Sequence, residues 1–213
     1  MCAVRALDRL DTLVIVCGGV SSQLGNDNEP DRDARMAEAF AAMHQLTRLE
    51  VASARCPLSF PPALRRLRLD SVPGDDEAQV AVIDRIGELT LLTHLELARC
   101  GVDVNLAPLA SLANLETFGF AGNSRASLAP LATLTRLTSL DLAGMYLSDH
   151  SGHGVHSVRV PDGLATLTTL RALNMSEIHL LEGWDDVVAA LHPSTVYDAT
   201  GTTMAPSDGW TTV

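Results

Sequence analysis

Three histidines in one short glycine-containing segment form a pattern that could bind a metal ion. His150, His153 and His156 are spaced three residues apart and follow Asp149. Three imidazoles and a carboxylate can hold zinc in tetrahedral geometry. The glycines between them make it entropically costly to close the segment on a metal, and the HExxH order is absent. We expect a solvated loop and therefore no metal ligand, with adventitious metal binding and a functional metal site in a hydrolase as the alternatives.

No other residue pattern predicts a reaction centre. The chain contains no lysine, which excludes a Walker-type phosphate loop, a Schiff-base lysine and the strand lysine of kinases. No GxSxG elbow favours Ser–His–Asp catalysis. Asn174-Met175-Ser176 matches a glycosylation sequon, which we interpret as a chance match on a strand. We therefore predict no catalytic residue, no cofactor and no enzymatic activity.

Charge and cysteine usage limit the cellular setting and the partners. The 15 basic and 26 acidic side chains give a net charge of −11, which is unlike a nucleic-acid binder or a protein of anionic membrane surfaces. No segment has the apolar length of a membrane span, and the first residues do not form a signal peptide. The four cysteines lack CxxC spacing, which indicates a reduced environment. They are Cys2, Cys17, Cys56 and Cys100. We expect a cytoplasmic protein, although a trimmed N-terminus would hide a signal.

The elements that must position any site come from an internal repeat. The chain has 33 leucines, and residues 106–127 match residues 128–149 at a shift of 22. Both copies contain the pattern L-x-x-L-x-L. The pattern begins at Leu10, Leu46, Leu64, Leu92, Leu115, Leu137 and Leu170, and in a degenerate copy at Leu191. The alternating L-x-L part predicts a short strand with one buried face, and neighbouring copies bury their leucines together.

This pattern resembles the leucine-rich repeat family along nearly the whole chain. The 22-residue copies are most similar to the internalin type, which also occurs in regulatory subunits of type-1 protein phosphatase. The resemblance implies an α/β fold: a curved right-handed solenoid with a parallel sheet on the concave face and short helices or turns on the convex face. Each repeat of this family often has an asparagine or cysteine at one position after the strand. In this chain only Cys100 and Asn123 match that position, so we expect the asparagine ladder to be largely missing.

We predict one domain over residues 1–213 with about eight units. Insertions are expected near residues 18–42, 72–86 and 148–162, and residues 181–213 are expected to form a C-terminal cap and tail. The spacing of Met36, Phe40 and Met43 predicts one helix, and that of Val82, Ile86 and Leu89 predicts another. A third helix is expected at residues 184–192, whereas residues 148–160 show no periodicity and are expected to form a loop.

The residues between the buried strand positions should face solvent on the concave side. The first half of this surface carries charges of both signs, and the second half carries small residues around Asp141. The predicted partner-binding residues are Arg48, Glu50, Arg66, Arg68, His94, Glu96, Arg99, Gly119, Asp141 and Asn174. In the last copy we expect Thr195 to occupy the solvent-facing position between the two buried strand residues; we call the series of these positions along the repeats the column. The alternative interpretation is a charged surface that is merely solvated.

We expect a non-catalytic scaffold or regulatory subunit that binds a protein partner through the concave face. The alternatives are a fragment of an extracellular adhesin or receptor, and a degenerate repeat protein with no specific ligand. The segment TLVIV at residues 12–16 should form an exposed sheet edge unless a further unit precedes it. Self-association through this edge is therefore a further prediction.

Overall fold

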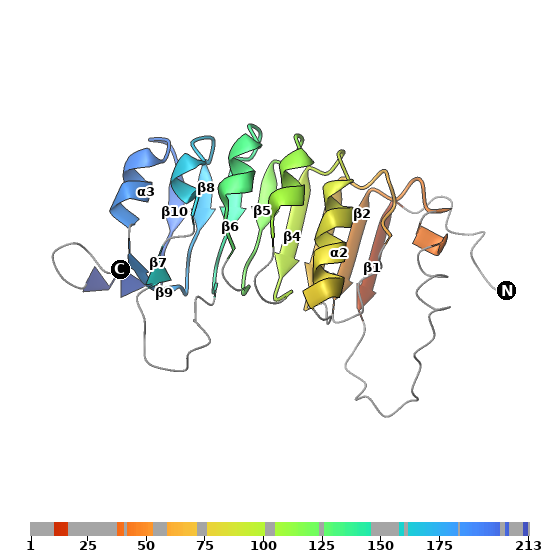
Figure 1. Ribbon diagram of the computed structural model, residues 1–213, viewed down its shortest axis with the longest axis horizontal. Coiled ribbons are helices and arrows are strands. Elements are labelled where there is room, and N and C mark those ends of the chain that lie inside the picture. Colours follow the sequence, from red (N-terminus) through yellow and green to blue (C-terminus); the bar gives the residue numbers. More distant parts are fainter. Residues whose placement is uncertain are drawn as a thin grey trace, which may run out of the picture.

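A parallel sheet of eight strands organises the computed structural model of this protein. The residues described are 11–16, 38–40, 42–52, 59–71, 76–100, 105–123, 126–145, 158–159, 162–182, 184–200, 203–204 and 211–212. The strand order β1-β2-β3-β4-β5-β6-β8-β10 follows the chain, so each repeat adds one strand beside the previous one (Figure 1). The predicted histidine cluster at residues 150, 153 and 156, together with Cys2, Cys17 and Cys56, lies outside the described residues.

The strands of this sheet coincide with the L-x-L parts of the repeat. They are β1 (Thr12–Val16), β2 (Arg48–Ala52), β3 (Arg66–Asp70), β4 (His94–Ala98), β5 (Thr117–Gly119), β6 (Ser139–Asp141), β8 (Ala172–Asn174) and β10 (Val196–Asp198). In β3, Leu67 and Leu69 are buried and Arg68 between them is exposed, as a strand with one covered face requires. The strand register predicted from the leucines is confirmed from β1 to β8.

The register predicted for the last repeat is wrong by three residues. Val196, Tyr197 and Asp198 pair with Ala172, Leu173 and Asn174, so the repeat begins three residues later than the degenerate copy at residue 191 suggested. Tyr197 takes the position of a core leucine but is 48% exposed. Burial at the end of the sheet is too weak to demand leucines there, and the periodicity that marks the other repeats is lost.

Short helices cover one face of the eight-stranded sheet (Figure 1). They are α2 (Asp76–Gly87) and α3 (Trp184–Ala190), and the 3₁₀ helices η2 (Ala107–Ser111), η3 (Ala129–Thr133) and η4 (Leu164–Thr166). Val82, Ile86 and Leu89 are buried as their spacing predicted, and Phe40 is buried in the first predicted helical segment. Proline in the first turn of η2 and η3 fixes the backbone where no amide hydrogen is needed.

One continuous apolar core lies between the helices and the sheet. Phe118 and Phe120, which occupy the L-x-L positions of the repeat that begins at Leu115, are both buried, and their rings stack with centroids 5.8 Å apart. Threonine hydroxyls donate to backbone carbonyls of the preceding repeat at 2.6–3.3 Å, which holds adjacent units together where the strands begin. These residues are Thr47, Thr93, Thr138, Thr169 and Thr195.

Asn123 provides a second tie between repeats, where the strands end. Its side chain is buried, its Nδ2 donates to the carbonyls of Leu97 and Phe120, and its Oδ1 accepts the backbone N–H of Cys100 at 2.7 Å. Cys100 itself is half-buried and packs against the core. One buried amide thus connects two consecutive turns.

A second, four-stranded sheet near the C-terminal end was not predicted. Its order is β12-β11-β9-β7, with β7 (Val158–Arg159), β9 (His179–Glu182), β11 (Thr203–Met204) and β12 (Thr211–Thr212). Strand β7 falls in the segment expected to be a loop, and β11 and β12 fall in the expected tail. Strands of two residues are too short to show any alternation, so periodicity could not reveal them. No helix in the described part of the chain is long and apolar enough to cross a membrane.

Candidate functional site

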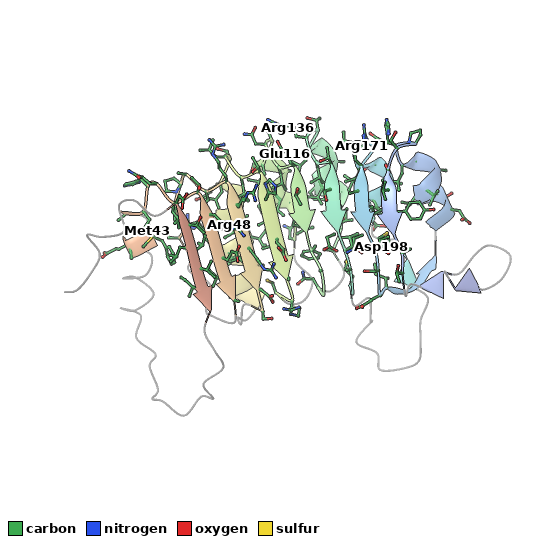
Figure 2. The ribbon with its side chains drawn as sticks, turned by 180° about the vertical axis from the view of Figure 1, so that it is seen from behind. Met43, Arg48, Glu116, Arg136, Arg171 and Asp198 are labelled. Carbon is green, nitrogen blue, oxygen red and sulfur yellow. The ribbon has the colours of Figure 1, made fainter. Side chains whose placement is uncertain are left out.

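The face of the main sheet that no helix covers carries the predicted binding residues, and we call it the open face (Figure 2). A hollow of about 280 Å³ crosses strands β2 to β6 on this face. It is lined by Arg48, Leu49, Glu50, Arg66, Leu67, Arg68, His94, Leu95, Glu96, Thr117, Gly119 and Asp141. Eight of the ten predicted partner-binding residues therefore line one surface, and Arg99 and Asn174 lie outside it. Their role in binding stays a prediction.

Ion pairs neutralise most of the charges in the hollow. Arg48 donates to Glu50 on the same strand through Nε at 2.8 Å, and also through its Nη2. Arg68 reaches across from β3 to β4, where its Nη1 lies 3.2 Å from a carboxylate oxygen of Glu96. A second nitrogen of Arg68 lies 3.6 Å from Asp70. Apart from the buried Asp70, the members of these pairs are partly solvent-exposed, so the pairs orient the side chains more than they stabilise the fold.

Arg99 forms a clamp at the C-terminal ends of the strands. Its Nη2 lies 2.6 Å from both carboxylate oxygens of Asp70, which is only 8% exposed, and its Nε donates to Ser71. Arg99 has a backbone φ of 50°, which turns its side chain back over the neighbouring repeat. A buried carboxylate needs such a partner. The structure thus gives Arg99 an intramolecular contact, and its predicted contact with a partner stays a prediction.

Two groups in the hollow have no ionic partner among the described residues. The guanidinium of Arg66 makes no ion pair or side-chain hydrogen bond there, although it stands between β2 and β4. Asp141 accepts the N–H of Ala143 at 3.0 Å and forms no ion pair within the described part of the chain. The hollow therefore has an unpaired positive charge toward one end and an unpaired negative charge at the other.

His94 lies next to Arg66 in the register of the sheet. Its Nδ1 is 2.9 Å from the hydroxyl of Thr93. Partial burial lowers the pKa of His94 below its usual 6.5, the charge of Arg66 lowers it further, and Glu116 opposes both effects. His94 is consequently neutral at pH 7 and can donate or accept a hydrogen bond.

Gly119 differs from its predicted environment. We expected it to face solvent among the small residues of the second half of the surface, but the residue is buried. An added Cβ would lie 3.1 Å from Cγ of Glu96, because that side chain folds over the glycine. Glycine here makes room for Glu96, which in turn holds Arg68. The small residue serves the ion pair as well as the shape of the hollow.

The C-terminal strands carry a row of turn-forming acceptors. Asp141, Asn174 and Asp198 each accept the backbone N–H of the second residue after them at 2.9–3.0 Å. Asp198, not the expected Thr195, completes the column, because the last repeat begins three residues later. The hydroxyl and N–H of Thr200 lower the pKa of Asp198. Asn174 and Asp198 are each followed two residues later by a serine or threonine, and this shared spacing could have revealed the position.

From the sequence, metal binding and glycosylation are only alternative interpretations, and the histidine cluster lies outside the described residues. No group of three or more histidine, cysteine, aspartate or glutamate side chains is close enough there to hold a metal ion. The sequon residue Asn174 lies half-buried at the end of β8, and its Oδ1 accepts from the backbone and hydroxyl of Ser176. The side-chain amide is thus already part of a turn.

Similar solved structures have the same architecture. Internalin C2 of Listeria monocytogenes superposes with a TM-score of 0.59 at 19% identity, covering 97% of this chain and 78% of that protein. An internalin (inlF) of the same organism gives 0.50 at 18% identity, with 79% and 52% covered. A leucine-rich repeat protein of Leptospira interrogans gives 0.50 at 17% identity, with 78% and 46% covered. The chain spans about half the length of the latter two proteins.

The leucine-rich repeat fold predicted from the sequence is confirmed by this similarity and by the eight-stranded parallel sheet. A scan against protein-family models finds no match, and neither does a comparison with curated proteins. At identities below 20%, a shared solenoid establishes the fold and leaves function to be argued from the site.

Proposed function

We propose that this protein is a non-catalytic binding module, a cytoplasmic scaffold or regulatory subunit, that binds a partner protein through the open face. The observation that carries this proposal is the hollow across β2 to β6, where five strands present polar and charged side chains to solvent. Repeat solenoids present such surfaces because each unit adds one strand to a continuous sheet.

The chemistry of the hollow favours recognition over catalysis. Its arginines and carboxylates are mostly paired with each other. A catalytic histidine needs an orienting carboxylate and a nucleophile, whereas the side-chain contact of His94 is with a threonine hydroxyl. Mixed charges on a rigid sheet suit electrostatic complementarity, which sets the orientation and association rate of a partner.

The openness and the charges of the hollow also argue against a small-molecule site. Such sites are concave and enclose most of the ligand surface. This hollow lies on an open sheet face, and four of its five strands carry charged groups: the pairs Arg48–Glu50 and Arg68–Glu96 and the single charges Arg66 and Asp141. A protein surface can cover an open, charged area of this kind, whereas a small ligand would remain largely solvated.

The test is affinity capture from an extract of the source organism with the full chain, quantified by mass spectrometry. Two variants change the hollow: Arg68→Glu reverses a charge, and Thr117→Arg adds bulk. Arg85→Glu is the matched control, because Arg85 is an exposed, ion-paired arginine on helix α2 at the opposite face. Circular dichroism of each variant verifies the fold.

We expect a protein that the wild type and Arg85→Glu capture equally and that both hollow variants lose. A partner that binds all four proteins equally would contradict the proposal, as would a chain that captures nothing specific.

A further inference from the structure

The unpaired charges of the hollow identify what kind of segment it should receive. Two charge clusters are internally neutralised: Arg48 pairs with Glu50, and Arg68 pairs with Glu96 and with Asp70, which lies outside the lining. Arg66 and Asp141 alone have no ionic partner among the described lining residues. A partner that covers these two side chains must supply their counter-charges, because a desolvated charge without a partner is costly.

The positions of these two residues set a distance. Arg66 is in register with His94, Thr117 and Ser139, so three strand spacings separate it from β6, and Asp141 lies two residues farther along that strand. With strands about 4.8 Å apart and about 3.3 Å per residue, their Cα atoms are about 16 Å apart. An extended chain covers that distance in about five residues.

The size of the hollow indicates a segment of chain instead of a domain surface. Five strands of three to five residues present an area of only about 300 Å². A stable interface between folded domains buries about 800 Å² per partner. The strand backbones are already hydrogen-bonded to their neighbours in the parallel sheet, so a bound segment would meet side chains.

The charge of the whole chain favours a segment that carries both signs. At −11 the protein repels a polyanionic peptide at long range, whereas one carboxylate accompanied by a basic residue is not repelled. The hollow reproduces this pattern with reversed signs, since its positive group lies on β3 and its negative group on β6. The complementary ligand is a single extended stretch with an acidic residue near one end and a basic residue near the other.

We propose that the hollow binds an extended peptide segment of the partner, with an aspartate or glutamate opposite Arg66 and an arginine or lysine about five residues away opposite Asp141. This inference rests on the proposed function and specifies its ligand. The side chains between the two charged residues lie over His94, Thr117 and Glu96, where small or polar groups fit.

The experiment selects peptides from a random twelve-residue display library on the immobilised full chain. We expect the enriched peptides to share an acidic and a basic residue about five positions apart. A labelled synthetic peptide of the enriched sequence is then titrated against purified variants. Arg66→Glu and Asp141→Lys should each weaken its binding at least tenfold, and Arg85→Glu should leave it unchanged.

A charge exchange separates a direct contact from a loss of fold. A peptide in which lysine replaces the acidic residue should bind the wild type at least tenfold more weakly and recover its affinity for Arg66→Glu. Arg66→Gln, which removes the charge without reversing it, should give an intermediate loss. Recovery by the matched pair cannot arise from misfolding.

Two results would overturn this inference. One is an enriched sequence without the acidic and basic pair, or no enrichment at all; the other is a peptide whose affinity is insensitive to Arg66→Glu. The proposed function is contradicted by a separate result, namely a captured partner protein whose binding is unchanged by Arg68→Glu and Thr117→Arg. A partner that needs the hollow but uses a different charge spacing would leave the function intact and refute the peptide rule.

Discussion

Replacing Asn123 with alanine should destabilise the protein more than any other amide substitution in the described residues. Its side chain is 1% exposed and connects two turns through Leu97, Phe120 and Cys100. A hydrogen bond contributes about 1 kcal/mol net, and a buried group left without its partner costs about 1–3 kcal/mol. Three lost bonds amount to about 3 kcal/mol. For a chain of this size, we expect the melting temperature to fall by about 6–12 °C.

The measurement is thermal and urea unfolding followed by circular dichroism. Asn114→Ala is the matched control, because Asn114 is half-buried, donates one bond to the carbonyl of Thr90 and accepts one exposed bond from Arg136. It should cost less than about 1 kcal/mol.

Asn123→Asp refines the test. The carboxylate can still accept from Cys100 but faces two carbonyl oxygens, so its pKa should be raised above that of the unfolded chain. Its stability should therefore be greatest at low pH and fall as the pH rises through the raised pKa. Equal losses for Asn123→Ala and Asn114→Ala, or an Asn123→Asp variant without this pH dependence, would refute the reasoning.

Three further predictions use the same unfolding assay. Leu140→Asp should cost about 3–5 kcal/mol by burying an unpaired charge, whereas Asp141→Ala should cost about 1 kcal/mol or less; equal effects would refute the strand register. Gly163→Ala should lower the free energy of unfolding by more than about 2 kcal/mol, because φ is 90° and an added Cβ would lie 2.4 Å from a backbone nitrogen. The control Gly144→Ala, where a Cβ would meet open space, should lower it by about 1 kcal/mol. Partial burial and a neighbouring guanidinium lower the pKa of His94, so the stability of the protein should decline as the pH falls below about 6.5. His94→Gln should make this decline smaller. An NMR titration that gives His94 a pKa at or above 6.5 would contradict this prediction.

The fold was predictable from the sequence wherever burial is complete. Leu67, Leu95 and Leu140 are each almost fully buried, and a position that must exclude water repeatedly selects the same apolar residue. The same reasoning explains the failure at the last repeat. Tyr197 stands in the leucine register but is half exposed, so water no longer constrains the residue type. Periodicity reports burial, and it disappears where burial does.

The candidate site was predictable in its location and not in its internal contacts. The leucine register places Arg68 beside both Glu50 and Glu96, and the sequence alone gives no reason for its choice of Glu96. That choice depends on Gly119, which leaves space for the Glu96 side chain in the next repeat. Side-chain packing over three strands decides the pairing.

The consequence of these pairings is that specificity resides in the charges that remain. The residue types along the solvent-facing strand positions suggest a surface on which positive and negative charges are equally available. Glu50 and Glu96, however, are each ion-paired with an arginine on the same or the neighbouring strand. Within the described hollow, only Arg66 and Asp141 form no ion pair. Because screening weakens charges beyond about 10 Å in ordinary salt, a ligand about 16 Å long must meet each of them locally. Two separated contacts on a rigid sheet define a direction as well as an affinity, which a single charged patch could not do.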